Sequence, residues 1–382
     1  MSPSVRDRHE ALLRSGSKLQ STQILTQRPG GSGVLIELAF VGVCGTDLQI
    51  LNGRRPDTAE ILGHEGVGTV VEAGELAPLH VGEHVMLNPC AQLPIGRILG
   101  HNTPGLFQKR LTVDSHAVAD GLVIPTRRSD IAIHDALVEP LGAVIYAHRL
   151  IANKVSPLRT AVVLGAGTVG LLAATYLTAM GVQVWLAHPT QARLDTAIAL
   201  GIVNRASTLC VTENLPARVL SLNKGKPLDA GLICTTRIGA PTALQHALEV
   251  VRDGGCVDLI TNYPHSQDPP YGIKVADIDA TRAGNVNGMP SEGRYLTVDI
   301  RSRRIALTGH RGTHRDHLEH AMRTLRSGSS AYEKLITHTL PLHEAAQAIE
   351  HLSHTQIRTL NGRDCIKLII DMTTPRSAAP AF

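Results

Sequence analysis

Short apolar runs and glycine-rich segments alternate along the first part of the chain. Residues 34–43 are apolar apart from Glu37, which is the pattern of a strand. Residues 63–85 alternate glycine with valine and threonine, as in the short, sharply turning strands of a small barrel. The first part of the chain is therefore predicted to be rich in β-structure.

From residue 160 onward, apolar runs alternate with segments that have the 3.6-residue period of helices. The predicted strands are residues 161–164, 183–186, 231–234 and 256–260. This alternation predicts an α/β fold with a doubly wound parallel sheet. We expect the chain to return to the first domain near Leu340 and to end with the apolar run 366–370.

Two helices are expected around Pro140. A helix capped by Asp130 is expected to end before this proline, and Pro140 suits the first position of the next helix, which continues to Leu150. A residue that precedes proline is biased toward extended backbone. We therefore expect Glu139 to be extended and to point into a cleft.

Length and hydropathy favour two domains and no membrane span. The chain has 382 residues, whereas single cores rarely grow beyond about 250–300 residues. Residues 160–187 carry no charged side chain, but they divide into strand, glycine turn, helix and strand, as buried parallel sheets do. The first ten residues lack the apolar run of a secretory signal, and the six cysteines form no CxxC pair. A cytoplasmic location is expected.

The charge pattern excludes nucleic acid as the expected partner. The formal net charge is only +4, and the basic residues are scattered along the chain. The densest run, residues 301–304, is read as a solvated turn and strand face.

Three residues of types that bind Zn²⁺ occur near one another in the first part. Cys44 follows the strand at 34–43, and His64 and Glu65 stand side by side in a glycine-rich segment. A thiolate, an imidazole and a carboxylate are all zinc ligands in proteins. Taken singly, each has a plain structural explanation, a buried cysteine or a hydrogen-bonded histidine, so the prediction of a metal site depends on their joint occurrence.

A phosphate-binding loop follows the apolar run 162–164. In this strand–loop–helix context the first glycine permits a tight turn, the second lets a pyrophosphate approach, and the third lets helix and strand pack closely. The helix N-terminus then offers N–H groups to the phosphates. We predict that a nicotinamide dinucleotide is bound by Gly165, Ala166, Gly167, Thr168, Val169 and Gly170.

The end of the next strand bears on the choice of cofactor. An NAD enzyme presents Asp or Glu there to the ribose hydroxyls, but residues 183–187 lead into His188 with no acid. His188, Thr190 and Arg193 could donate to a 2′-phosphate instead. Arg193 could equally be an exposed residue in the first turn of a helix. NADP is favoured over NAD.

Taken in order, these motifs resemble the zinc-dependent medium-chain dehydrogenase/reductase family, and within it the sorbitol dehydrogenase branch. The resemblance runs from Val34 through Glu139-Pro140-Leu141 to Leu340-Pro341-Leu342. It implies a GroES-like barrel as the catalytic domain, at residues 1–152 and 340–382. It also implies a Rossmann domain at residues 153–339, and a homodimer or homotetramer is expected.

The resemblance also implies roles for the site residues. Cys44 and His64 would be direct zinc ligands, and Glu65 and Glu139 would be ligands or exchange with water as the coordination changes. Asp47 would orient His64 through its free ring N–H, the alternative being a plain turn or cap aspartate. Thr46, Asp47 and Glu65 are thus the expected catalytic residues, with Thr46 placed to take the substrate proton.

Two positions depart from the family pattern. Gln49 stands where a histidine continues the proton relay, so water or another histidine is needed in its place. Of the four close cysteines that hold a structural zinc in many members, only Cys90 is present in segment 88–94. One zinc ion per chain is therefore expected, with no structural zinc.

Together these features predict a zinc-dependent oxidoreductase. It would transfer a hydride between a secondary alcohol (a polyol, cyclitol or sugar derivative) and a nicotinamide cofactor. Two alternatives stay open: a zinc-free medium-chain reductase of an enone or ketone, and a non-catalytic dinucleotide-binding protein. The retained ligand set argues against both.

Overall fold

A computed structural model describes residues 8–90, 96–212, 214–355 and 358–375. These residues fall in two compact units, one within Met1–Glu139, Leu318–Ser329 and Ile336–Phe382, the other within Pro140–His317 and Ser330–Leu335. The domain boundaries inferred from the sequence, after residues 152 and 339, stay a prediction. None of the described helices is long and apolar enough to cross a membrane.

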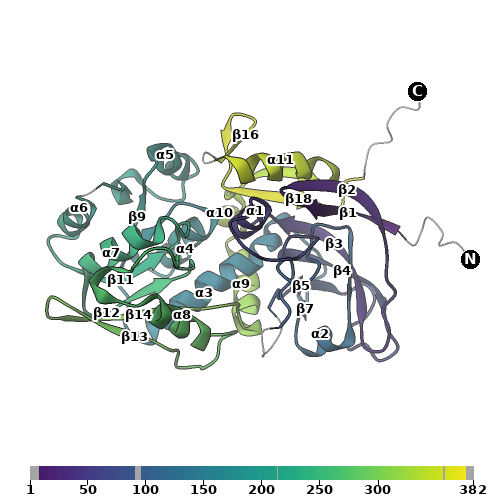
Figure 1. Cartoon of the computed structure of the whole chain (residues 1–382), viewed down its shortest axis with the longest axis horizontal. Helices are drawn as coiled ribbons and strands as arrows, with labels where there is room; N and C mark the ends of the chain where they lie inside the picture. The colour runs from purple at the N-terminus through teal and green to yellow at the C-terminus, as the bar shows by residue number, and fades with distance from the viewer. Residues whose placement is uncertain (1–7, 91–95, 213, 356–357, 376–382) are drawn as a thin grey trace, which may run out of the picture. The chain divides into compact units, whose positions relative to one another are not determined.

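The first unit is built around a largely antiparallel sheet (Figure 1). Its strands pair in the order β15-β18-β3-β4-β5-β7, and β6 also pairs with β3. Their bounds are β3 (Val34–Gly42), β4 (Glu65–Ala73), β5 (His84–Leu87), β6 (Arg110–Val113), β7 (Val123–Pro125), β15 (Ile336–Pro341) and β18 (Lys367–Asp371).

Close packing of β3 on β4 explains the glycine-rich sequence of β4. A Cβ atom on Gly68 would lie 2.4 Å from the carbonyl oxygen of Glu37 on β3, so no side chain fits there. The register of the two strands shifts at Leu35/Ile36 and at Leu38/Phe40. Such bulges bend a strand and increase its twist, as the sequence pattern predicted for this segment.

The other described elements of the first unit pack around this sheet. The apolar face of α11 joins the same core as β3 and β4 through Leu342, Ile349 and Leu352. The bounds are β1 (Arg8–Ser15), β2 (Lys18–Leu25), α1 (Gly45–Leu51), α2 (Ser115–Ala119), α11 (Leu342–His354), β16 (Thr359–Leu360) and β17 (Arg363–Asp364).

The second unit contains the predicted parallel sheet. Its strand order is β10-β9-β8-β11-β12-β14-β13, and every pairing is parallel except that of β13 with β14. Counted along the chain, the six parallel strands have the order 3-2-1-4-5-6 of a dinucleotide-binding sheet. The bounds are β8 (Thr160–Leu164), β9 (Gln183–His188), β10 (Thr208–Cys210), β11 (Leu228–Ile233), β12 (Val251–Leu259), β13 (Leu296–Ile300) and β14 (Arg303–Gly309). The doubly wound sheet is thus confirmed.

Helices connect these strands, as the 3.6-residue period between the apolar runs predicted. The main ones are α4 (Thr168–Ala179), α5 (Gln191–Ala199), α6 (Leu215–Leu222), α7 (Ala240–Val250) and α8 (Val275–Gly284). Of the two helices that follow, α9 (Arg315–Ser327) belongs largely to the first unit and α10 (Ser329–Glu333) largely to the second. A core of buried Val, Leu, Ile and Ala side chains joins α6 and α7 to the sheet.

Two helical segments meet near Pro140, as expected, but the expectation that Glu139 is extended was wrong. A 3₁₀ helix, η2 (Ile133–Leu137), runs directly into α3 (Val138–Ala152), and Glu139 and Pro140 both lie in the first turn of α3. The first turn tolerates proline because its backbone nitrogen has no partner to bond there. Glu139 is therefore helical and not extended.

Candidate metal centre and cofactor loop

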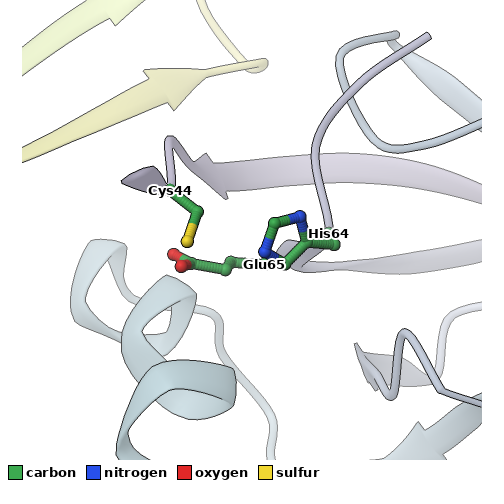
Figure 2. Close-up of side chains that lie close together, drawn as sticks. All are labelled: Cys44, His64 and Glu65. Carbon is green, nitrogen blue, oxygen red and sulfur yellow. The ribbon is translucent and has the colours of Figure 1, made fainter. Parts of the chain in front are cut away.

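Three side chains from two neighbouring strands meet in the first unit. Cys44 follows β3, and His64 and Glu65 stand at the start of β4, which pairs with β3 so that Gly42 lies opposite Glu65. One ligand atom from each side chain lies within 4.8 Å of those of the other two (Figure 2). The antiparallel pairing thus brings residues 44 and 64–65 together, as predicted.

Asp47 lies next to His64, and its role in orienting the imidazole stays a prediction. It is fully buried, and one carboxylate oxygen lies 3.3 Å from His64 Nδ1. It also accepts hydrogen bonds from the backbone N–H groups of Cys44 (2.9 Å) and Gly63 (3.1 Å). With Nδ1 facing Asp47, Nε2 is the nitrogen left to bind a metal.

The charges in this group reinforce one another. Burial raises the pKa of Asp47, but His64 and the two backbone donors outweigh burial and hold this pKa below its usual value. Burial likewise lowers the pKa of His64, but the neighbouring Asp47 and Cys44 raise it well above its ordinary value.

Lys367 completes the group, and sequence analysis missed it. Its side chain is 1% exposed, forms an ion pair with Glu65 and donates to the carbonyl of Val43 (3.2 Å). Burial lowers its pKa, but Glu65 and Cys44 raise it above the usual value. The available signal was one lysine in the otherwise apolar run 366–370.

Gly42 makes room for this ion pair. A Cβ atom at Gly42 would lie 2.4 Å from a carboxylate oxygen of Glu65 and 2.8 Å from Nζ of Lys367. The strand β18 that carries Lys367 pairs with β3, with Ile369 opposite Gly42. The ion pair therefore depends on three adjacent strands.

Glu139 lies outside the three-residue cluster but interacts with it electrostatically. Burial raises the pKa of Glu139 to about 7, with His64 opposing this rise and Glu65 adding to it. Its role as a fourth ligand stays a prediction.

Thr46 and Gln49 both lie in α1, the helix that begins directly after Cys44.

A second histidine lies next to the candidate metal ligand. The ring centroids of His101 and His64 are 5.2 Å apart, and Nδ1 of His101 is 2.8 Å from a carboxylate oxygen of Asp57. Burial and the charge of His64 lower the pKa of His101 to about 4.

The expected absence of a structural zinc concerns segment 88–94, of which residues 91–94 lie outside the described residues.

The donor set fits a zinc ion. It combines a thiol, an imidazole and a carboxylate, all at least largely buried. Nδ1 of the imidazole, the nitrogen that would not bind the metal, faces the Asp47 carboxylate. These are the ligand types and the supporting contact that a catalytic zinc site uses.

The predicted dinucleotide loop has the geometry that phosphate binding needs. Gly165 has φ +119°, and a Cβ atom on Gly170 would lie 1.8 Å from the carbonyl oxygen of Gly165, so both positions require glycine. By contrast, a Cβ atom on Gly167 would meet no atom within 4 Å. Gly167 is the residue just before α4, so open space adjoins the N-terminus of that helix.

A cavity of about 210 Å³ continues from this loop across the carboxyl ends of the strands. It is lined by Leu164, Ala187, Val211, Thr235, Ala243 and His246, among others. Ligands of doubly wound sheets bind at this edge. A largely apolar wall with a few polar groups suits the adenosine part of a dinucleotide.

His188 lies at the end of β9, beside this cavity. Its Nδ1 lies 3.0 Å from the backbone nitrogen of Thr190 and 3.3 Å from the Thr190 carbonyl oxygen. Arg193 lies in the first turn of α5. The strand thus ends in an imidazole where the NAD pattern has an acidic residue.

Comparison with known proteins agrees with these features. Residues 30–124 match the family model for the alcohol dehydrogenase GroES-like domain. The sorbitol dehydrogenase of Bombyx mori is 25% identical over 375 residues, which cover 90% of this chain and 95% of that protein. The L-galactonate-5-dehydrogenase of Escherichia coli K12 is 26% identical over 367 residues, covering 90% and 92%.

A solved structure shows the same fold. The alcohol dehydrogenase of Thermotoga maritima aligns with a TM-score of 0.73 and 20% sequence identity, over 95% of this chain and 99% of that one. At this identity the likeness concerns the fold. The predicted pair of folds, a GroES-like barrel and a Rossmann sheet, is confirmed.

Proposed function

We propose that this chain oxidises a polyhydroxylated secondary alcohol and prefers NADP as its cofactor. The chain belongs to the medium-chain zinc-dependent dehydrogenase family and is a zinc-type NAD(P)-dependent alcohol or polyol dehydrogenase. The observation that carries the proposal is the convergence of Cys44, His64 and Glu65 within 4.8 Å. A zinc-free reductase or a non-catalytic binding protein has no need of that set.

The residues of the site divide the work as follows. Cys44, His64 and Glu65 would hold a zinc ion, which acts as a Lewis acid and lowers the pKa of the alcohol hydroxyl. Asp47 keeps the His64 ring in the orientation that exposes Nε2. The reaction moves a hydride from the alcohol carbon to the nicotinamide ring and releases the hydroxyl proton. We assign Thr46 as the first member of the proton relay: its hydroxyl accepts this proton as it passes its own to water or to another histidine, because Gln49 cannot act as a base.

Two carboxylates near the metal site favour a polyol. Glu65 forms an ion pair with Lys367, and Glu139 lies close enough to His64 and Glu65 for their charges to shift its pKa. Carboxylate ligands that exchange with water leave room for a substrate to bind through two neighbouring hydroxyls. The relatives named for sorbitol and L-galactonate also act on polyhydroxylated compounds by name. A cytoplasmic location and a homodimer or homotetramer stay predictions.

A substrate panel tests the substrate class. With zinc-loaded protein and NADP⁺, we expect kcat/KM for sorbitol, xylitol or a cyclitol to exceed that for ethanol or 1-octanol by at least about tenfold, because a site built to bond hydroxyl groups rejects analogues that lack them. Initial rates of NADPH formation measure this. A preference for simple aliphatic alcohols would refute the polyol assignment and leave the zinc and hydride chemistry in place.

The cofactor choice is tested at Arg193. We expect NADP(H) to support turnover at least as well as NAD(H), because no acid at the end of β9 repels a 2′-phosphate. Arg193→Ala should lower kcat/KM for NADP(H) by about tenfold, the effect of one charge-assisted hydrogen bond, and should leave NAD(H) nearly unchanged. Arg205→Ala, which removes an exposed arginine beyond α5, serves as the control. A strong preference for NAD(H) that Arg193→Ala does not alter would contradict the assignment.

A further inference from the structure

A histidine outside the three-residue donor set packs against it. The ring centroids of His101 and His64 are 5.2 Å apart, and the two rings are tilted by 57°. His101 is largely buried, with 16% of its side chain exposed. It is neither one of the predicted metal ligands nor the residue assigned to accept the substrate proton. The proposed reaction therefore gives this second imidazole no role.

Close packing and hydrogen bonds fix the loop that carries His101. Gly100 has φ +70°, and a Cβ atom there would lie 2.5 Å from the carbonyl oxygen of Gly63, which precedes the metal ligand. The N–H of His101 donates to the carbonyl of Ile98 (3.1 Å), and its carbonyl accepts the N–H of Ala59 (2.8 Å). The ring extends from a backbone that is held in place, so little order has to be gained when a ligand binds.

One nitrogen of the His101 ring already has a partner. Nδ1 lies 2.8 Å from a carboxylate oxygen of Asp57, whereas Arg55 Nη2 lies farther from it, at 3.5 Å. Burial raises the pKa of Asp57, but Arg55 and His101 outweigh burial and hold this pKa below its usual value. An ionised carboxylate can only accept a hydrogen bond, so Nδ1 donates to it.

The other ring nitrogen, Nε2, is left for a ligand. It forms no hydrogen bond with any residue that the structure describes. In a largely buried imidazole, an unmade hydrogen bond costs free energy that a ligand can restore. A hydroxyl group both donates and accepts, so it can bond Nε2 whether or not the ring is protonated. A carboxylate or an ammonium group suits only one of these two states.

We propose that His101 binds a second hydroxyl group of the substrate, next to the hydroxyl that the metal ion activates. The inference rests on the proposed function, because a polyol is the substrate that brings a further hydroxyl group to this ring. The His101 ring adjoins a metal ligand, so a substrate that reaches the metal also comes close to the ring. His101 thus selects compounds with neighbouring hydroxyl groups over monohydric alcohols, because without the second hydroxyl Nε2 stays unbonded.

A matched pair of ligands, trans-1,2-cyclohexanediol and cyclohexanol, isolates the second hydroxyl group. His101→Asn keeps a side-chain N–H for Asp57 but has no atom in the place of Nε2, whereas the longer amide of His101→Gln reaches that place. His116→Asn is the control, since His116 is an exposed histidine of α2 in the same unit. Isothermal titration calorimetry on zinc-loaded protein gives the Kd of both ligands without turnover. Zinc content and circular dichroism check the metal and the fold of each variant.

We expect the wild type and His116→Asn to bind the diol about tenfold more tightly than cyclohexanol. In His101→Asn the Kd of the diol should rise about five- to tenfold, the effect of one hydrogen bond between neutral groups, while that of cyclohexanol stays within about twofold. His101→Gln should recover part of the loss.

The ratio of the two Kd values separates this role from the alternatives. A purely structural role would raise both values together, so a wild-type ratio in His101→Asn would overturn the proposal and leave the polyol function in place. Loss of zinc from His101→Asn would overturn it too, since the ring would then support His64 and not the substrate. A wild type with no preference for the diol would refute the polyol function and the role of His101 together.

Discussion

Cys44→Ser protein should lose its zinc and nearly all of its turnover while it keeps its fold. Cys44 supplies the thiolate of a three-residue donor set, and a serine hydroxyl is a far weaker zinc ligand at neutral pH. We expect less than about a hundredth of the wild-type kcat, since the Lewis acid is worth several kcal/mol. Removal of the metal with a chelator should have the same effect on the wild type, and zinc should restore the activity.

Zinc content by mass spectrometry and kcat under saturating substrate measure these effects. Cys90→Ser is the matched control, because burial and the nearby Glu139 raise the pKa of the Cys90 thiol to about 12 and so keep it a neutral, poor ligand. This variant should keep one zinc ion per chain. Well-washed wild-type protein that holds close to two zinc ions per chain would contradict the prediction of a single site.

The parallel sheet could be predicted because its strands are apolar on both faces. The runs 161–164 and 183–186 lie within β8 and β9, and the glycine loop between them follows the first strand, as the dinucleotide pattern requires. The predicted ends were less accurate: β11 spans Leu228–Ile233, whereas the apolar pattern placed the strand at 231–234. Apolar runs report burial, but strand ends depend on pairing with neighbours.

The site was predictable only in part, and its two gaps have different physical causes. Cys44, His64 and Glu65 follow from local motifs, but the contact between Lys367 and Glu65 joins residues 302 positions apart. It exists because β18 pairs with β3 and β3 with β4, which no local pattern encodes. The expectation for Glu139 failed for another reason. A residue before proline favours extended backbone, but Glu139 lies in the first turn of α3 and is helical. Proline is tolerated next to it because the first turn of a helix has no need of the N–H that proline lacks.

Lys367→Met should destabilise the protein, and more severely without zinc than with it. The substitution keeps most of the side-chain volume but leaves the buried carboxylate of Glu65 without its cation. Removing one partner of a buried ion pair costs about 3–5 kcal/mol. A bound zinc ion offers the same carboxylate a second cation, so the loss in the free energy of unfolding should be smaller in the zinc-loaded protein.

Urea unfolding of Lys367→Met, with and without zinc, measures the two losses. Lys367→Arg retains the charge and should lose less stability than Lys367→Met in zinc-free protein. The double variant Glu65→Gln/Lys367→Met removes both charges, so it should recover stability relative to Lys367→Met alone, as neutral replacement of a buried pair commonly does. If the loss is equal with and without zinc, or if the double variant is no more stable than the single one, then Lys367 does not act through the charge of Glu65. Lys367 would then stabilise the protein through packing and not through its charge, and a zinc ion at the metal site would not neutralise the Glu65 carboxylate.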